Sequence, residues 1–155
     1  MSARAPLSLS IQYASTRACP DRAQLRRWTR AALDGALAAA PEVAARGARF
    51  VVRFVDRAEG LELNRRYRGR HYATNVLTFA FDDGAVKCAD IVLCAPIVEA
   101  EARAARKLLR EHYAHLVTHG VLHALGYDHD KPRAAQRMER LEASVLARFH
   151  ISDPY

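Results

Sequence analysis

The sequence predicts an α+β fold, in which a small mixed sheet of about four strands packs with about five helices. Strand-like segments fall mainly in the first two thirds of the chain, whereas helical periodicity dominates the remainder. The 155 residues suffice to bury one sizeable core, and no repeat, low-complexity tract or linker divides them. We therefore expect a single domain over residues 1–155, although the order of the strands does not follow from the sequence.

The first half of the chain predicts two strands and two helices. Residues 7–13 alternate apolar and polar side chains, and residues 48–55 are rich in Val and Phe, as strands are. Pro20 and Asp21 start a helix that extends to about Ala39. The apolar stripe of this helix consists of Leu25, Trp28, Ala32, Leu33 and Ala36.

A shorter helix is predicted after the second strand, from Asp56 as N-cap to about Tyr67. Its residues Leu61 and Leu63 are expected to help cover the sheet. Two more strands follow at about residues 75–81 and 89–94, joined across the turn signal Asp82-Asp83-Gly84. Three further helices are predicted at about residues 96–106, 108–125 and 132–149. The apolar face of the last one consists of Met138, Leu141, Val145 and Leu146.

Composition indicates in which cellular compartment the protein works. No signal peptide is recognisable near the N-terminus, and no apolar run approaches the roughly 20 residues needed to span a bilayer. We therefore expect a cytoplasmic protein with no membrane partner. The three cysteines, Cys19, Cys88 and Cys94, show no CxxC spacing and are expected to be reduced and mostly buried.

The basic charge is unevenly distributed along the chain. The formal net charge is +7, and residues 1–70 hold 14 Arg or Lys against 6 Asp or Glu, whereas residues 71–155 hold 10 against 11. Arginine can grip a phosphate in two places, and a basic surface attracts polyanions. Charge alone is weak support for nucleic-acid binding, because high arginine content also has other origins.

Three histidines near the start of the last quarter of the chain are spaced to hold one metal ion. His119 and His123 are four residues apart, so they lie one turn apart on the same face of a helix. Gly126 is expected to end that helix, after which the chain can return His129 to the open side of the pair. Three imidazoles leave a fourth position for water, which is typical of catalytic zinc sites. The alternative is that these histidines bind nothing, but three at this spacing argue against it.

The residue after the first histidine bears on the chemistry. Zinc peptidases of the related helix motif carry a glutamate there as general base, whereas this chain has Gly120. A metal site without a built-in base suits a substrate whose own charge the metal neutralises, and a phosphodiester is the obvious candidate. His112 and His115 share the helical face, but His112 lies about 10 Å along the axis from His119. These two histidines are expected to pack or to support the site.

A run of arginines at residues 65–70 has two interpretations. Composition alone favours a solvated helix end, where cations meet the negative pole of the helix. The alternative is that the run contacts an anionic substrate. Asp128 has two equally weighted interpretations as well: it orients a ligand imidazole, or it is a turn residue after Gly126.

Several segments of the chain resemble those of a known family. From about Val52 to Tyr155 the chain resembles the YbeY family of endoribonucleases, the bacterial ribosomal RNA maturation factors. The matching blocks are Leu63-Asn64-Arg65-Arg66-Tyr67-Arg68-Gly69, Thr74-Asn75-Val76-Leu77-Thr78-Phe79, Asp90-Ile91-Val92-Leu93-Cys94, Glu99-Ala100, the histidine segment, and Met138-Glu139 with Glu142. The resemblance implies one zinc ion on His119, His123 and His129, with nickel and copper as other metals that three imidazoles suit.

The resemblance also implies an activity and its partners. It implies cleavage of single-stranded RNA, 16S ribosomal RNA 3′-end maturation, ribosome quality control and contact with small-subunit components, and nothing in it points to DNA. Arg68 takes the position of the family's functional arginine, while the other arginines keep the solvated interpretation. Arg70, Thr74 and Asn75 are in addition candidates for binding substrate.

These expectations combine into one mechanism with two rivals. Zinc would activate a water or polarise a phosphoryl oxygen, and Arg68 would stabilise the charge that develops on the phosphorus centre. One rival is a ribosome-assembly or RNA-binding factor in which zinc serves structure. The other is a metallopeptidase, against which Gly120 argues.

Overall fold

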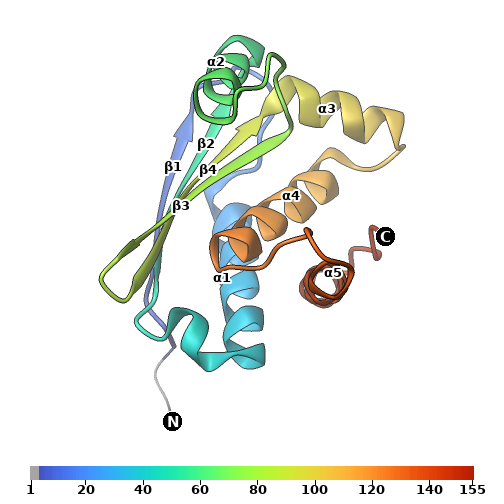
Figure 1. Ribbon diagram of the computed structural model, residues 1–155. Helices are drawn as coiled ribbons and strands as arrows, with labels where there is room; N and C mark the ends of the chain where they lie inside the picture. The colour runs from blue at the N-terminus through green and yellow to red at the C-terminus, as the bar shows by residue number, and fades with distance from the viewer. Residues whose placement is uncertain (1–3) are drawn as a thin grey trace.

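A computed structural model describes residues 4–155 and contains a four-stranded mixed sheet, which confirms the predicted fold class (Figure 1). The strands are β1 (Leu7–Tyr13), β2 (Ala48–Val55), β3 (Val76–Asp83) and β4 (Val86–Cys94). They are arranged in the order β1-β2-β4-β3. β1, β2 and β4 are parallel, whereas β3 pairs antiparallel with β4. β1 and β3 are therefore the edges of the sheet.

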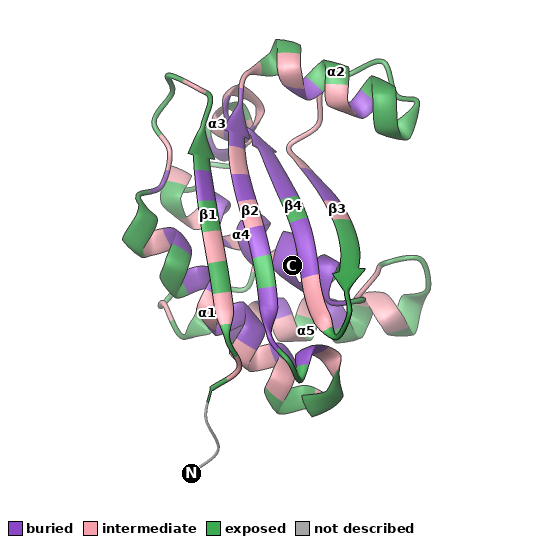
Figure 2. Ribbon diagram, turned by 90° about the vertical axis from the view of Figure 1, so that its left-hand side faces the viewer, coloured by how far each residue is buried: buried purple, intermediate pink, exposed green. Residues whose placement is uncertain are grey.

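The helices lie mainly on one face of the sheet. They are α1 (Arg22–Ala39), the short 3₁₀ helix η1 (Pro41–Ala44), α2 (Arg57–Arg68), α3 (Ala95–Ala104), α4 (Leu109–Ala124) and α5 (Pro132–Ala147). α4 packs against β3 and β4, and both α1 and α5 pack against α4. Figure 2 looks onto the opposite face, where only α2 lies over one end of the strands. The candidate metal-binding helix α4 is thus held between the sheet and two other helices.

Burial explains why these segments form these elements. The predicted stripe of α1 is buried throughout, and Asp21 starts the helix through a capping box with Gln24. β2 and β4 are central strands, and Phe50, Phe54 and Ile91 are fully buried between the sheet and the helices. The predicted apolar face of α5 also packs into this core. All three cysteines are free, with one of them only partly buried.

Two local expectations were wrong, and a third was confirmed only in part. Leu61 is 39% exposed, so only Leu63 packs on the sheet. Asp56 occupies the N-cap position of α2 as expected, but its carboxylate makes no capping bond and accepts a hydrogen bond from Ser15 Oγ. Asp82 and Asp83 belong to β3, and the left-handed Gly84 makes the turn. The strand pairing therefore extends further than the sequence suggests, since polar residues at the exposed end of a hairpin resemble a turn.

Gly120 is buried where α4 meets the sheet. A Cβ built at this position lies 2.9 Å from Ile91 Cγ2 and 3.4 Å from Thr78 Oγ1. Ile91 is a stiff, fully buried side chain on β4, so it has little room to move. The missing side chain at residue 120 therefore lets the helix approach the strands closely.

We expect Gly120→Ala to lower the free energy of unfolding by about 1 kcal/mol. Overpacking a core costs about 1–3 kcal/mol, and the gain in helix propensity offsets only about 1 kcal/mol of that. Urea denaturation of the metal-free protein measures the difference. Gly60→Ala is the control, because its Cβ would meet no atom closer than Cys94 Sγ at 3.3 Å. Equal effects of the two substitutions would contradict the packing explanation.

Within residues 4–155, no helix combines the length and the apolar character that crossing a bilayer requires. This agrees with the absence of a long apolar run in the sequence.

Candidate functional site

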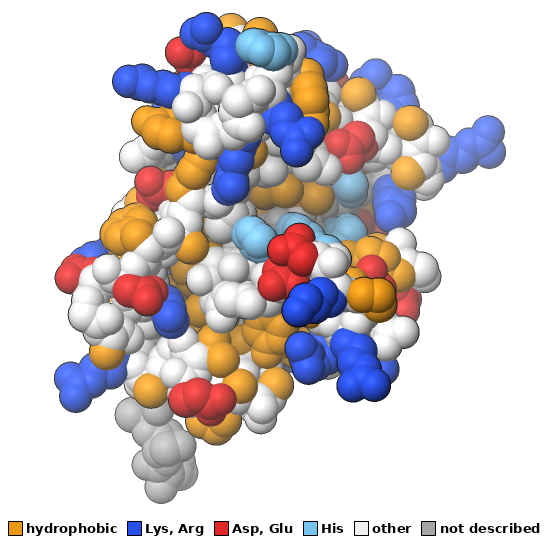
Figure 3. Space-filling view, viewed as in Figure 1, with side chains coloured by type: hydrophobic (Ala, Val, Ile, Leu, Met, Phe, Trp, Pro, Cys, Tyr) orange, Lys and Arg blue, Asp and Glu red, His pale blue; other side chains and the backbone are white. Residues whose placement is uncertain are grey.

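The three predicted histidines lie together at the C-terminal end of α4. Gly126 has a φ of 102°, and the chain turns back beyond it as expected. The rings of His119 and His123 are nearly parallel, with centroids 6.3 Å apart. The His129 ring stacks on His119 with centroids 4.7 Å apart. Two positions of α4 and the loop that follows it thus bring three imidazoles near one another. Figure 3 shows histidine side chains gathered at a hollow in the molecule.

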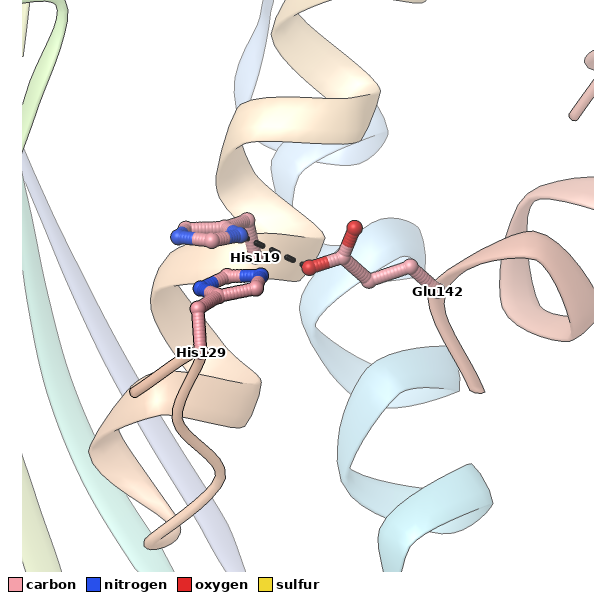
Figure 4. A group of neighbouring side chains, drawn as sticks. All are labelled: His119, His129 and Glu142. Carbon is pink, nitrogen blue, oxygen red and sulfur yellow. Dashed lines mark hydrogen bonds and ion pairs between the residues drawn. The ribbon is translucent and has the colours of Figure 1, made fainter. Parts of the chain in front are cut away.

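A buried carboxylate lies behind these rings. Glu142, fully buried on α5, has Oε1 2.7 Å from His119 Nδ1 (Figure 4). Its other oxygen lies 3.1 Å from His115 Nε2 and accepts a hydrogen bond from the Tyr155 hydroxyl. Three donors therefore converge on one carboxylate, and His119 is held with Nε2 facing away from it.

The environment of Glu142 keeps it ionised. Burial alone would raise the pKa of this carboxyl, but hydrogen bonds from His115, His119 and Tyr155 lower it to about 2. Burial, together with the contact to Glu142, raises the pKa of the Tyr155 hydroxyl, so tyrosine remains the donor. Sequence reasoning did not assign Glu142 a role at the site. The available signal was an acidic residue at a buried position in the apolar stripe of α5.

The second histidine is oriented by the backbone. His123 Nδ1 lies 3.0 Å from the carbonyl oxygen of Tyr127, in the loop after Gly126. With Nδ1 engaged in both His119 and His123, Nε2 is the free ligand atom of each ring. Among the described residues, the group whose ligand atoms all lie within 4.8 Å of one another is His119, His129 and Glu142, without His123. This group could hold a metal ion.

A cleft of about 290 Å³ opens beside the histidines. It is lined by Asn64, Arg68, Arg70, Tyr72, Thr74, Val76, Leu77, Thr78, His119 and His123. Arg68, the last residue of α2, donates to the Thr78 carbonyl at 2.8 Å and lies over the Phe79 ring, 5.4 Å from its centroid. Arg68 and two histidines therefore line the same cavity, although they are far apart in sequence.

Only some of the remaining candidate site residues line the cleft. Arg70 and Thr74 line the cleft, whereas Asn75 does not. The Asn75 side chain, just before β3, instead donates to Glu101 and accepts from the Val76 N–H. Asp128 accepts from the Asp130 N–H, which is turn geometry, and Glu142 and the Tyr127 carbonyl orient the rings instead.

The two other histidines of α4 act as supports. His115 contacts Glu142, as described, and the His112 ring lies 3.2 Å from Glu101 through Nε2. Burial lowers the pKa of His112, although the contact with Glu101 opposes the effect. Both positions agree with the expectation of packing or supporting residues.

We expect the metal-free protein to lose stability in acid through Glu142. The folded-state pKa of about 2 lies below the unfolded value of about 4.3, so the contribution is present above that value and is lost as the pH falls towards 2. Glu142→Gln removes this contribution. Urea denaturation at several pH values should therefore show a flatter pH dependence for the variant below about pH 4.3. Parallel curves for the two proteins would contradict the assignment.

Comparison with known proteins identifies the family. The family model described as Endoribonuclease YbeY matches residues 10–150. The chain belongs to the YbeY endoribonuclease family. Endoribonuclease YbeY of Bordetella pertussis is 53% identical over 151 residues, which cover 96% of each chain. The protein of the same name from Cupriavidus metallidurans is 46% identical over 158 residues and is matched over 73% of its length.

A solved structure supports the fold of this YbeY family member. The solution structure of a Thermotoga maritima protein covers 92% of this chain with a TM-score of 0.57. Its sequence is 22% identical, so it bears on the fold alone. The family resemblance inferred from the sequence is confirmed by the family match, and that match extends to residue 10, well before Val52.

Proposed function

We propose that this chain is a metal-dependent endoribonuclease that hydrolyses phosphodiester bonds of single-stranded RNA. The observation that carries the proposal is a cleft lined by His119, His123 and Arg68, with the His129 ring stacked on His119. Family membership supports the activity on RNA. We further propose the cytoplasm as its location, and 16S ribosomal RNA 3′-end maturation and ribosome quality control, in contact with small-subunit components, as its role.

The residues present fit one divalent cation of the zinc type. We assign His119, His123 and His129 as its ligands and Glu142 as the group that orients His119. Both Glu142 oxygens already accept hydrogen bonds from neighbouring side chains, so the carboxylate is poorly placed to turn towards a metal. Carboxylate-to-histidine contacts behind a metal are a common support. Nickel and copper share the preference for imidazole.

The chemistry divides between the ion and the chain. A cation held by these imidazoles would supply Lewis-acid chemistry to the phosphodiester. Arg68 binds a non-bridging phosphate oxygen and stabilises the negative charge that grows during the reaction. Its bond to the Thr78 carbonyl uses one amino group and fixes the guanidinium, so the remaining donors face the substrate. Arg70 and Thr74 bind the strand beside the reacting bond.

The packing around Gly120 weighs against the peptidase alternative. A glutamate at this position would have to enter the space between α4 and the sheet, where even a Cβ meets Ile91 at 2.9 Å. The chain therefore has no room for the base that zinc peptidases carry there. Two nucleophiles then remain for RNA: a water, or the 2′-hydroxyl of the substrate.

The test is cleavage of a single-stranded RNA with and without chelator, alongside metal analysis of the purified protein. We expect about one metal ion per chain, cleavage that chelator abolishes, and recovery when zinc is restored. Cleavage that survives complete metal removal would overturn the proposal. If chelator also unfolds the protein, the metal serves structure, as in the assembly-factor alternative. A 2′,3′-cyclic phosphate on the product identifies the 2′-hydroxyl as nucleophile, and a 3′-hydroxyl end excludes it.

A further inference from the structure

A second, larger cavity lies on the other side of the sheet from the histidines. It has a volume of about 500 Å³ and is formed between α2 and the face that the other helices leave open (Figure 2). Val51 and Val92 form an apolar floor, and Tyr67 and Phe79 form an aromatic wall. Tyr67 is 58% exposed, so most of its ring is accessible from solvent.

The aromatic wall is flanked by cations. The rings of Tyr67 and Phe79 meet edge to face with centroids 5.3 Å apart. The Arg66 guanidinium lies 5.7 Å from the Tyr67 ring centroid, and Arg68 lies 5.4 Å from that of Phe79. Aromatic rings interleaved with arginines are the usual means by which proteins bind single-stranded nucleic acid, since bases stack on the rings and phosphates meet the cations.

The rim of the cavity offers hydrogen-bonding groups for the edge of a base. The Arg53 side chain is held by Glu59 at 2.6 and 2.8 Å and by the Gln12 side-chain oxygen at 3.0 Å. Asp90 is exposed, and within residues 4–155 its carboxylate has no side-chain hydrogen bond or ion pair. A carboxylate accepts from exocyclic amino groups, which adenine, cytosine and guanine carry and uracil lacks.

This cavity adjoins the catalytic cleft across β3. Thr78 lines the cleft and the next residue, Phe79, lines the second cavity, because neighbouring side chains of a strand point to opposite faces. Arg68 contacts both residues. β3 is an edge of the sheet, so no further strand blocks passage around it. A single extended strand of RNA can therefore cross from one cavity to the other.

We propose that this second cavity binds a nucleobase of the substrate strand, away from the bond that is cut. The base stacks on Tyr67, and Asp90 favours bases that carry an amino group. This inference rests on the proposed ribonuclease function and extends it. Tyr67, the exposed aromatic residue among the arginines at residues 65–70, does not line the catalytic cleft. The proposal gives this residue a role in binding RNA.

The test compares Tyr67→Ala with wild type on two substrates: a long single-stranded RNA and a trinucleotide too short to reach beyond the cleft. Stacking contributes about 1–3 kcal/mol per base, so KM on the long RNA should rise about 5- to 150-fold with kcat unchanged. KM and kcat on the trinucleotide should not change. Phe81→Ala is the matched control, since Phe81 is an aromatic residue of β3 that is 55% exposed and lines neither cavity.

The outcomes separate the two proposals. If wild type cuts neither RNA, the proposed function fails. If wild type cuts the long RNA and Tyr67→Ala cuts it equally well, only the proposal for the second cavity is refuted. The same holds if Tyr67→Ala raises KM equally on the long RNA and the trinucleotide. An equal effect of Phe81→Ala would also refute it. In addition, wild type should prefer oligocytidine over oligouridine, and Asp90→Ala should remove that preference. Melting temperatures verify that the variants are folded.

Discussion

Arg68→Ala is expected to reduce the rate of RNA cleavage by about 10²- to 10³-fold while leaving metal content unchanged. Removing one preorganised donor to a developing negative charge has effects of this size in other enzymes. Arg68 is exposed at the end of α2, and its contacts are the Thr78 carbonyl and the face of Phe79. The substitution should therefore have little effect on the melting temperature. Cleavage assays with metal analysis measure both quantities.

The control is Arg65→Ala, from the preceding turn of the same helix. Arg65 pairs with Glu62 at the surface and does not line the cleft. We expect this variant to cleave RNA like wild type, because an exposed pair contributes little to stability. Arg68→Lys should recover only part of the rate, since an ammonium lacks the planar fork of arginine. If Arg68→Ala cleaves normally, the charge-stabilising role assigned to this residue is wrong.

His123→Ala is expected to abolish metal binding at stoichiometric zinc and, with it, RNA cleavage. His123 is exposed, and within residues 4–155 its side chain hydrogen-bonds only to the Tyr127 carbonyl, so the metal-free variant should melt near the wild-type temperature. His119→Ala is a poorer test, because it also removes a donor from the buried Glu142. Full zinc occupancy in His123→Ala would show that His119, His129 and Glu142 suffice as ligands.

Zinc binding by Glu142→Gln tests whether Glu142 supports the site or is itself a ligand. If the carboxylate only orients His119, zinc affinity should fall about 10- to 100-fold and added zinc should restore cleavage. If Glu142 is itself a ligand, the loss should resemble that of His123→Ala. Zinc titration of the two variants side by side therefore distinguishes a support from a ligand.

The sequence predicted the fold class and the convergence of the histidines because both depend on local patterns. Alternation and helical stripes define the strands and helices, and the spacing of His119, His123 and Gly126 places two imidazoles on one turn before a reversal. The family match extends this reasoning to the activity. These features need no knowledge of contacts between distant segments.

The missed features depend on such contacts. Glu142 reaches His119 only because α5 packs on α4, and nothing in the spacing of 23 residues indicates this. The second cavity depends on α2 lying over the open face of the sheet. Asn75 was a substrate candidate, but its side chain donates to Glu101 and does not line the cleft. Neighbours in sequence need not face the same cavity.

The close approach at Gly120 ties catalytic geometry to core packing. The helix that carries His119 and His123 rests on the strand that carries Thr78, to which Arg68 is bonded. The thickness of the layer between them thus determines how far the proposed metal ligands lie from the Arg68 guanidinium. Glycine at residue 120 keeps this layer as thin as possible. A larger side chain there would increase the distance between the histidines and Arg68 that a phosphate must span.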